Sequence, residues 1–249
     1  MAAGKIDFLG PISLHQLQYC DNFTSSTYVI NISEIQVGRM NAIFSDLPVK
    51  DGKSGSWTLD TFTITENDAE RLAIRVDFSG NQDEFIPPGE YRRLSCNSDV
   101  VMSNTPMEIR TCMDFIERAT GHVLINGLGL GMVLHAVLMK ADVTHVTVIE
   151  KEQDVINLVA SSFAHDKRVE IICADAMTFV PPTDVTYDVC WHDIWPQFSM
   201  GNLDEMEMLE RKYLYRCQWQ GSWGKEQCEK ELINFIQIEG EIEKWLQRV

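Results

Sequence analysis

Short, near-continuous apolar segments alternate with helix-length amphipathic segments through the middle of this 249-residue chain. The apolar segments predict strands and the amphipathic ones predict helices. The expected strands are His122–Asn126, Thr144–Glu150, Val169–Ala174 and Tyr187–His192, with helices Met132–Lys140 and Glu152–His165 between the first three. Strands that are apolar throughout and alternate with helices form parallel sheets. The middle of the chain is therefore predicted to be α/β, a mostly parallel sheet with helices on both faces.

The first 95 residues have a different pattern, in which β-branched and aromatic residues cluster or alternate. Such segments are typical of strands, and breaks rich in Gly and Asp separate them. The segments are Tyr28–Ile32, Trp57–Thr65 and Leu72–Phe78. Residues 1–95 are therefore predicted to form a β-rich N-terminal section.

Thr105, Pro106 and Glu108 together have the pattern of a helix N-terminus. The Thr hydroxyl can accept a backbone N–H, the Glu can reach back to the chain before the helix, and Pro is favoured at the first helical position. The helix is expected to run to about Thr120, where Gly121 can end it. It belongs to a core section predicted over residues 96–200.

From Asn202 onward the sequence shows no convincing strand pattern. Two charged amphipathic helices are expected there, Asn202–Cys217 and Gly224–Val249, which makes residues 201–249 a helical C-terminal extension packed on the core. The apolar residues expected to contact the core are Met206, Leu209, Tyr213, Leu232, Phe235, Ile236 and Ile242. Between the helices, Gln218–Trp223 contains two tryptophans, which either pack in the core or wall a site.

Composition and charge narrow the classes of function. The formal net charge is −16 and the longest basic run is Arg92-Arg93, so a nucleic-acid partner is not expected. An acidic surface keeps a protein soluble, and it can also attract a cationic small substrate. The seven cysteines are scattered without Cys-x-x-Cys spacing, so we expect no metal site and a reducing, cytoplasmic location. No stretch approaches the ~20 apolar residues of a membrane span, so no membrane partner is expected.

A glycine-rich or acidic motif follows each of the four predicted strands. The carboxyl ends of the strands line the ligand crevice of a Rossmann-like sheet. The first motif is Asn126–Gly131, whose glycines permit a tight turn and a close approach of backbone N–H groups to a ligand. Met132 stands where a dinucleotide-binding loop has its third glycine, which disfavours a nicotinamide or flavin cofactor.

The other three motifs supply carboxylates. Glu150 ends the second strand, where an acid can accept hydrogen bonds from both hydroxyls of a ribose. Asp175 and Ala176 follow the third strand, where a carboxylate and a backbone N–H can address an adenine ring. Asp193 follows the fourth strand. Each of these acids has an alternative interpretation, as a cap of the helix or turn that follows it.

Residues from about Val101 to Gln197 resemble the class I S-adenosylmethionine-dependent methyltransferases, and most of all their spermidine synthase branch. The resemblance rests on the glycine loop, the segment around Glu150, the turn at Asp175, and the strand that leads to Asp193. It implies S-adenosylmethionine as the cofactor. The cofactor-binding residues it implies are Asn126, Gly127, Leu128, Gly129, Gly131, Glu150, Lys151, Asp175, Ala176 and Asp193.

The sequence also departs from that family. Spermidine synthases carry an Asp in the glycine loop that holds the amine of their decarboxylated cofactor, and Leu130 stands in its place. Three functions therefore stay open. They are methyl transfer to a small-molecule acceptor, spermidine synthase-like aminopropyl transfer, and nucleoside binding without turnover. A homo-oligomer is compatible with each of them.

The predicted catalytic residue is Asp193, which would orient or deprotonate the acceptor. His192 is a second candidate proton acceptor, but alternation along the strand should point it away from the side of Asp193. Trp191 and Trp195 either shape an aromatic pocket that attracts the sulfonium or simply pack.

Overall fold

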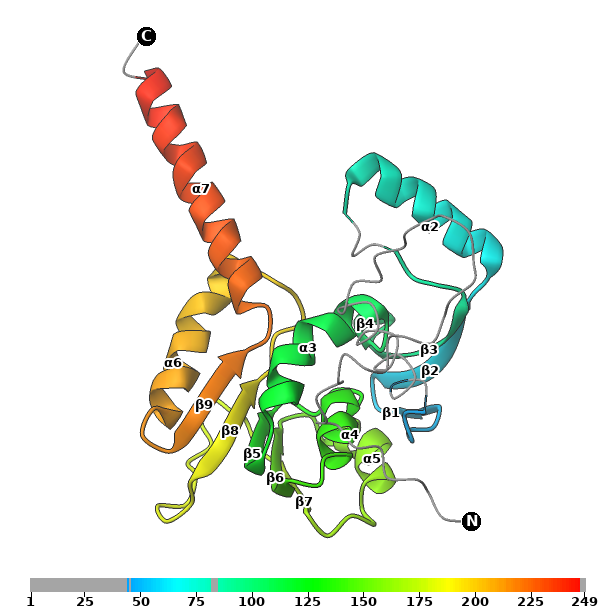
Figure 1. Cartoon of the computed structure of the whole chain (residues 1–249), viewed down its shortest axis with the longest axis vertical. Coiled ribbons are helices and arrows are strands. Elements are labelled where there is room, and N and C mark those ends of the chain that lie inside the picture. The colour runs from blue at the N-terminus through cyan, green and yellow to red at the C-terminus, as the bar shows by residue number, and fades with distance from the viewer. Residues whose placement is uncertain (1–43, 45, 82–84, 247–249) are drawn as a thin grey trace, which may run out of the picture.

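The structure, a computed structural model, describes residue 44 and residues 46–81 and 85–246. Its centre is a five-stranded parallel sheet, and a smaller, four-stranded antiparallel sheet precedes it in the chain (Figure 1). The predicted α/β, Rossmann-like fold is confirmed. The predicted strand Tyr28–Ile32 lies outside the described residues.

The central sheet has the strand order β7-β6-β5-β8-β9. Its strands are β5 (Gly121–Asn126), β6 (Val143–Glu150), β7 (Val169–Cys173), β8 (Tyr187–His192) and β9 (Cys217–Ser222). From β5 the chain winds outward through β6 and β7, and then returns to the other side of β5 to form β8 and β9. Open α/β sheets bind ligands at such a reversal, in the crevice outside the carboxyl ends of the two central strands.

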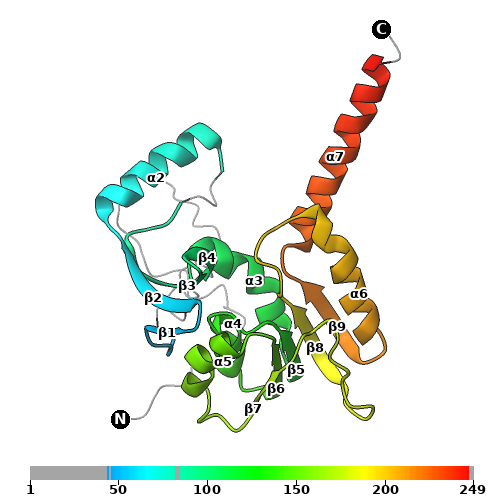
Figure 2. The same cartoon turned by 180° about the vertical axis from the view of Figure 1, so that it is seen from behind.

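Helices cover both faces of this sheet, as predicted (Figures 1 and 2). One face carries α3 (Pro106–Arg118), α4 (Met132–Leu138) and α5 (Gln153–Val159), which a 3-10 turn, η3 (Ala160–Ser162), extends. The other face carries α6 (Leu203–Tyr213), which follows η4 (Met200–Asn202). Successive strand residues point to opposite faces, so Ile125 of β5 joins the first core and Leu124 joins the second.

The expectation of no strand after Asn202 is wrong, because Cys217–Ser222 forms β9 at the edge of the sheet. It pairs with β8 in parallel, with Trp219 opposite Val189 and Ser222 opposite His192. An edge strand is bonded on one side and only partly buried, so Gln218 and Gln220 are tolerated within it. A search for continuous apolar runs therefore misses it.

The N-terminal sheet has the order β1-β2-β3-β4, all antiparallel. Its strands are β1 (Gly52–Ser54), β2 (Trp57–Ile64), β3 (Gly89–Cys96) and β4 (Asp99–Ser103). The predicted strand Trp57–Thr65 is confirmed by β2. The sheet continues past residue 95 through β4, and the division of the chain into three sections stays a prediction.

The predicted strand Leu72–Phe78 is wrong, because these residues lie in α2 (Glu66–Ser79). Thr65 and Asp68 form a reciprocal capping box at its start, and Gly80 ends it in the left-handed conformation with φ 70°. These end signals outweigh the β-branched composition of the segment. Along the helix only Ala69 and Val76 are buried.

The start of α3 also differs from the prediction. Thr105 is the N-cap and Pro106 is the first helical residue, as expected, but the Thr105 side chain makes no capping hydrogen bond. Glu108 Oε1 instead accepts hydrogen bonds from the backbone N–H of Ser103 (2.8 Å) and from its hydroxyl (2.9 Å). Gly121 does not end the helix, which stops at Arg118; it is the first residue of β5, with φ 58°.

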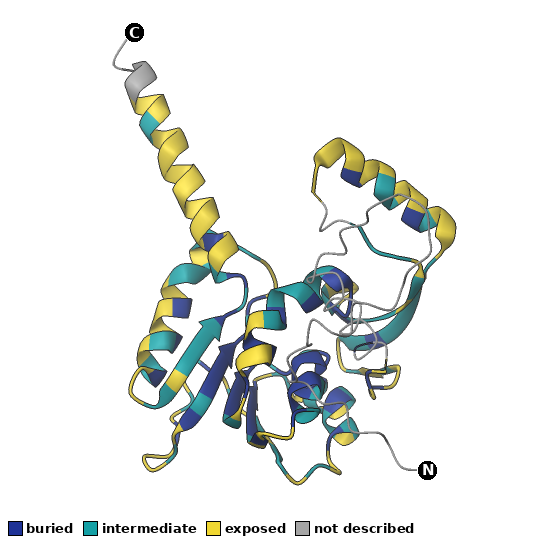
Figure 3. Ribbon diagram, in the orientation of Figure 1, coloured by how far each residue is buried: buried dark blue, intermediate teal, exposed yellow. Residues whose placement is uncertain are grey.

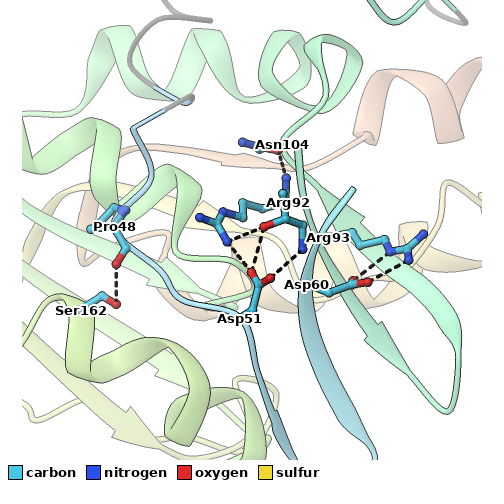
Figure 4. A network of polar contacts seen from close by, with 8 residues as sticks. Pro48, Asp51, Asp60, Arg92, Arg93, Asn104 and Ser162 are labelled. Carbon is cyan, nitrogen blue, oxygen red and sulfur yellow. Dashed lines mark hydrogen bonds and ion pairs between the residues drawn. The ribbon is translucent and has the colours of Figure 1, made fainter. Parts of the chain in front are cut away.

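Polar contacts fix the N-terminal sheet and dock it on the core (Figure 4). Arg93 forms two hydrogen bonds with Asp60, at 2.9 and 2.8 Å, and Arg92 pairs with Asp51. The hydroxyl of Ser162 donates to the carbonyl of Pro48 at 3.1 Å. The hydroxyl of Ser54 in β1 donates to Asp154 of α5 at 2.7 Å, so the N-terminal sheet is held beside α5.

The last helix, α7 (Lys225–Leu246), projects from the body of the protein (Figures 1 and 2) and is mostly exposed (Figure 3). Met206, Leu209 and Tyr213 of α6 are buried, as predicted. The expectation for Leu232, Phe235, Ile236 and Ile242 is wrong, since they are 37–58% exposed. The cause is the direction of α7, which leaves the core after the turn that buries Cys228. Across the described residues, no helix has both the length and the apolarity to cross a bilayer.

Candidate functional site

A cavity of about 460 Å³ lies at the carboxyl ends of the central strands. Predicted site residues from four separate motifs line it: Gly127, Leu128 and Gly129 after β5, Glu150 and Lys151 at β6, Asp175 and Ala176 after β7, and Asp193 after β8. They meet because parallel strands place their carboxyl ends along one edge of the sheet. Their roles toward a ligand stay predictions.

Positive φ angles shape the glycine loop between β5 and α4. Gly127 has φ 99° and Gly129 has φ 49°, backbone conformations that residues with a Cβ rarely adopt. The backbone N–H of Asp193 donates to the carbonyl of Asn126 at 2.8 Å, which ties the end of β8 to the loop. A Cβ added at Gly127 would lie 1.9 Å from the carbonyl oxygen of Asp193.

The structure does not bring Gly131 or the side chain of Asn126 to this cavity. Gly131 caps α4, and a Cβ there would meet the ring of Phe163 at 2.5 Å. Asn126 is fully buried, and its Nδ2 lies 2.8 Å from Nδ1 of His192. Both residues therefore support the fold of the loop from behind.

His192 lies on the α6 face of the sheet, the side to which strand alternation assigns it. Its Nε2 is 3.3 Å from Oε1 of Gln220, and its ring stacks on Tyr213. Accepting from Asn126 and donating to Gln220 places the ring proton on Nε2. Burial lowers the pKa of His192 to about 4, so the ring is neutral at pH 7 and faces away from the cavity.

Glu150 joins the glycine loop to the start of α5. Its Oε2 accepts from the backbone N–H of Leu128 and its Oε1 from that of Glu152, both at 2.8 Å. Each carboxylate oxygen retains a second lone pair. The carboxylate is therefore held in one orientation and can accept further hydrogen bonds from a ligand.

Asp175 adopts the alternative role as well, since it caps its own turn. Its Oδ1 accepts from the backbone N–H of Met177 at 2.7 Å. Lys212 of α6 donates to the carbonyls of Ala176 (2.7 Å) and Met177 (3.0 Å) and so fixes the turn from the other side. A capping contact and a place in the cavity wall are thus compatible.

The sequence interpretation missed Glu108, which lines the same cavity as Asp193. Burial raises the pKa of Glu108 to about 7, although the hydrogen bonds from Ser103 oppose the shift. Burial, followed by repulsion from Glu108, raises the pKa of Asp193 to about 7 as well. In the sequence Glu108 stood out only as an acid in the first turn of a predicted helix, where it fits a helix cap, so its place in the cavity was not predicted.

Aromatic side chains complete the end of the cavity near Asp193. Trp191 stacks on Phe115 with ring centroids 5.1 Å apart, and the Trp195 indole N–H donates to Glu205 at 2.8 Å. Both tryptophans are buried and both line the cavity, so packing and pocket formation occur together. Of the connector tryptophans, Trp223 lines the cavity, while Trp219 packs beside Phe115.

The N-terminal sheet provides a wall that no motif predicted. It contributes Trp57, Leu94, Cys96, Val101 and Met102. Met102 reaches the glycine loop, where its sulfur accepts from the backbone N–H of Leu130 at 3.3 Å. The adjacent residues Val101 and Met102 both line the cavity, so alternation along the strand does not select these side chains, and the docking of the sheet places them there.

Asp193→Asn is expected to stabilise the protein at high pH. The pKa of this carboxyl rises from 3.8 to about 7 on folding, so the stability that its protonated form provides is lost as the pH rises through 7. At about 1.4 kcal/mol per pKa unit, discounted for partial exposure, the variant should gain about 1–3 kcal/mol at pH 8 and nothing at pH 4. Denaturant unfolding at both pH values measures this. The control is Asp99→Asn at an exposed site, whose free energy of unfolding relative to the wild type should be the same at pH 4 and pH 8. If Asp193→Asn lost the same stability at both pH values, the expectation would be contradicted.

No protein-family model matches the sequence, and no curated protein matches it. Among solved structures, a spermidine synthase from Thermotoga maritima is similar over 68% of this chain and 52% of its own, at 18% identity and TM-score 0.41. A putative RNA methyltransferase from Pyrococcus horikoshii is similar over 53% of this chain and 65% of its own, at 13% identity and TM-score 0.38. A putative caffeoyl-CoA O-methyltransferase from Staphylococcus aureus is similar over 60% of this chain and 61% of its own, at 15% identity and TM-score 0.35.

Most of the similar solved structures are methyltransferases. This chain spans less than two thirds of the length of each of the three proteins described above. At these identities and TM-scores, function has to be argued from the site itself.

Proposed function

We propose that this protein is an S-adenosylmethionine-dependent methyltransferase with a small-molecule acceptor. The supporting observation is that the glycine loop, Glu150, Asp175 and Asp193 line one cavity at the reversal of the sheet. Its volume of about 460 Å³ lies within the range of small-molecule and cofactor sites. The acidic protein, at net charge −16, suits a small acceptor better than a nucleic acid.

The residues of the cavity fit an adenosyl cofactor. Glu150 offers carboxylate lone pairs for the ribose hydroxyls, and the turn at Asp175 and Ala176 addresses the adenine. Gly127 and Gly129, without Cβ atoms, let the backbone approach the rest of the ligand. When bound, the cofactor supplies an electrophilic methyl group.

The protein's own part in the reaction falls to Asp193. Methyl transfer to an amine or hydroxyl requires a proton to leave the acceptor, and a positioned carboxylate can take it. A general base is most effective when its pKa is near the working pH, and that of Asp193 is about 7. The buried tryptophans and the N-terminal sheet wall this end of the cavity, where the acceptor would bind.

Aminopropyl transfer is disfavoured by Leu130. In the spermidine synthase branch this loop position holds the amine of the decarboxylated cofactor with an Asp. Here the Leu130 side chain is fully buried in the apolar core. We further propose a cytoplasmic location, since the six cysteines among the described residues are all unpaired.

Glu150→Ala tests the cofactor site. The variant removes a carboxylate placed for the ribose, so binding of adenosyl ligands should weaken by roughly 1.5–3 kcal/mol. Calorimetric titration with S-adenosylhomocysteine measures the loss, and circular dichroism verifies the fold. Glu152→Ala is the matched control, because Glu152 also lines the cavity but contacts Glu150 through its backbone only. Unchanged affinity in a folded Glu150→Ala variant would remove Glu150 from the site.

A thermal-shift panel tests the cofactor class. It compares S-adenosylmethionine, S-adenosylhomocysteine, methylthioadenosine, the decarboxylated cofactor and NAD. A ligand at 100 times its dissociation constant adds about 2.7 kcal/mol of apparent stability. Stabilisation by NAD alone would overturn the proposal, and stabilisation by the decarboxylated cofactor alone would favour aminopropyl transfer.

A further inference from the structure

Negative charge dominates the lining of the cavity. The titratable side chains that line it are Cys96, Glu108, Glu150, Lys151, Glu152, Asp175, Asp193 and Glu205, and Cys112 lies behind them on α3. Six are acids and one is a base. Four of the acids accept hydrogen bonds from protein donors: Glu108 from Ser103, Glu150 from Leu128 and Glu152, Asp175 from Met177, and Glu205 from Trp195.

Glu108 and Asp193 line the same cavity, and repulsion from Glu108 is, after burial, the next cause of the raised pKa of Asp193. Ser103 bonds only Oε1 of Glu108, so the other carboxyl oxygen makes none of these contacts. Burial, and then the charges of Asp193 and Glu108, raise the pKa of the Cys112 thiol, which lies one turn after Glu108 along α3. The Trp191 indole nitrogen is buried and makes no hydrogen bond with the described residues, and it only partly opposes the rise that burial and Glu108 cause in the pKa of Asp193.

We propose that Glu108 and Asp193 act as a carboxyl pair that selects positive charge at the reactive centre, so that the sulfonium cofactor binds with release of a proton and the neutral thioether product is held less tightly. This inference rests on the function proposed above. It makes Glu108 a specificity-determining residue that separates substrate from product by charge.

The physical basis is the mutual repulsion of two partly buried carboxylates. Without a ligand, both acids have a pKa of about 7, so near neutral pH a proton neutralises part of the pair. A cation within ~4–6 Å of a carboxyl lowers its pKa by about 1–3 units. The carboxyl then ionises, its proton leaves to solvent, and no covalent bond other than O–H changes. S-adenosylhomocysteine has no charge on its sulfur, so it leaves the pair protonated.

The sign of the pH effect follows from linkage. Because the cation lowers the pKa of the pair, affinity for S-adenosylmethionine should rise with pH up to about 7 and then level off. The two ligands share their amino and carboxylate groups, so these cancel in the ratio of their dissociation constants. A shift of about two units predicts that the preference for S-adenosylmethionine grows roughly tenfold from pH 6 to pH 8.

Calorimetric titration of the full-length protein with both ligands at pH 6, 7 and 8 tests the proposal. Repeating the pH 7 titration in two buffers of different ionisation enthalpy counts the protons released. We expect about half a proton for S-adenosylmethionine and essentially none for S-adenosylhomocysteine. If both ligands bind with the same pH dependence and proton count, this inference is overturned while the proposed function stands. If neither ligand binds the folded protein at any pH, the proposed function itself fails.

Variants assign the effect to the pair. Glu108→Gln keeps an oxygen for Ser103 and removes the charge beside Asp193, so the tenfold change should shrink to about threefold or less. The double variant with Asp193→Asn should show a flat ratio. Glu152→Gln changes an acid on the ribose side and should keep the full tenfold change. Retention of that change in the double variant would overturn the assignment. If a Glu108 variant fails to fold, the pH dependence of the ratio of the two dissociation constants, compared between the wild type and Asp193→Asn, still tests the proposal.

Discussion

Gly127→Ala is expected to lower affinity for adenosyl ligands by roughly 100-fold or more. At this position φ is 99°, and the new Cβ would lie 1.9 Å from the carbonyl oxygen of Asp193. Backbone cannot rotate aside as a flexible side chain can, so the glycine loop and the end of β8 must separate. That movement breaks the hydrogen bond from the N–H of Asp193 to Asn126 and displaces Asp193 from the cavity. Calorimetry with S-adenosylhomocysteine measures the loss.

Gly129→Ala is the matched control within the same loop. Its added Cβ would meet the sulfur of Met102 at 2.5 Å, and a methionine end can move away. The φ of 49° then costs only about 1–2 kcal/mol, so binding should fall by about tenfold. Equal affinities for the wild type and Gly127→Ala, with both folded by circular dichroism, would mean that the loop does not contact the ligand.

Asp193→Asn is expected to reduce turnover by 10²–10⁴-fold, the range for loss of a general base. The amide keeps the size of the side chain but cannot take the acceptor's proton. Affinity for S-adenosylhomocysteine should stay within a few-fold, because Glu150 and Asp175 address the ribose and adenine. The rate is measured as S-adenosylhomocysteine formed with the acceptor that a panel of amines, hydroxyls and thiols identifies.

The pH profile of that rate separates chemistry from structure. The pKa of Asp193, about 7 in the free protein, predicts that the wild-type kcat/KM for the cofactor rises with pH through neutrality, and the variant should lose this rise. A variant as fast as the wild type would contradict the catalytic role. A wild type without turnover on any acceptor, despite binding both adenosyl ligands, would favour a binding protein over an enzyme.

The local sequence predicted an element correctly where the residues of that one segment are enough to identify it as a strand or a helix. The central strands are apolar because both faces of the sheet are covered, so β5, β6, β7 and β8 stand out in the sequence. Hydrophobic patterning failed for a strand that is not covered on both faces and for a helix whose ends carry the decisive signals. β9 is an edge strand with polar residues, and α2 has a β-like composition but takes its conformation from the capping box at Thr65.

By itself the sequence determined that the glycine loop, Glu150, Asp175 and Asp193 follow successive parallel strands and therefore share one edge of the sheet. Tertiary structure alone decided which side chains face the cavity there. It turned Asn126 away toward His192, brought Trp57 and Met102 over the loop, and made Glu108 a neighbour of Asp193. These outcomes depend on contacts between elements that are far apart in the sequence. The pKa of a carboxyl depends on its burial and on neighbouring charges, and those contacts determine both.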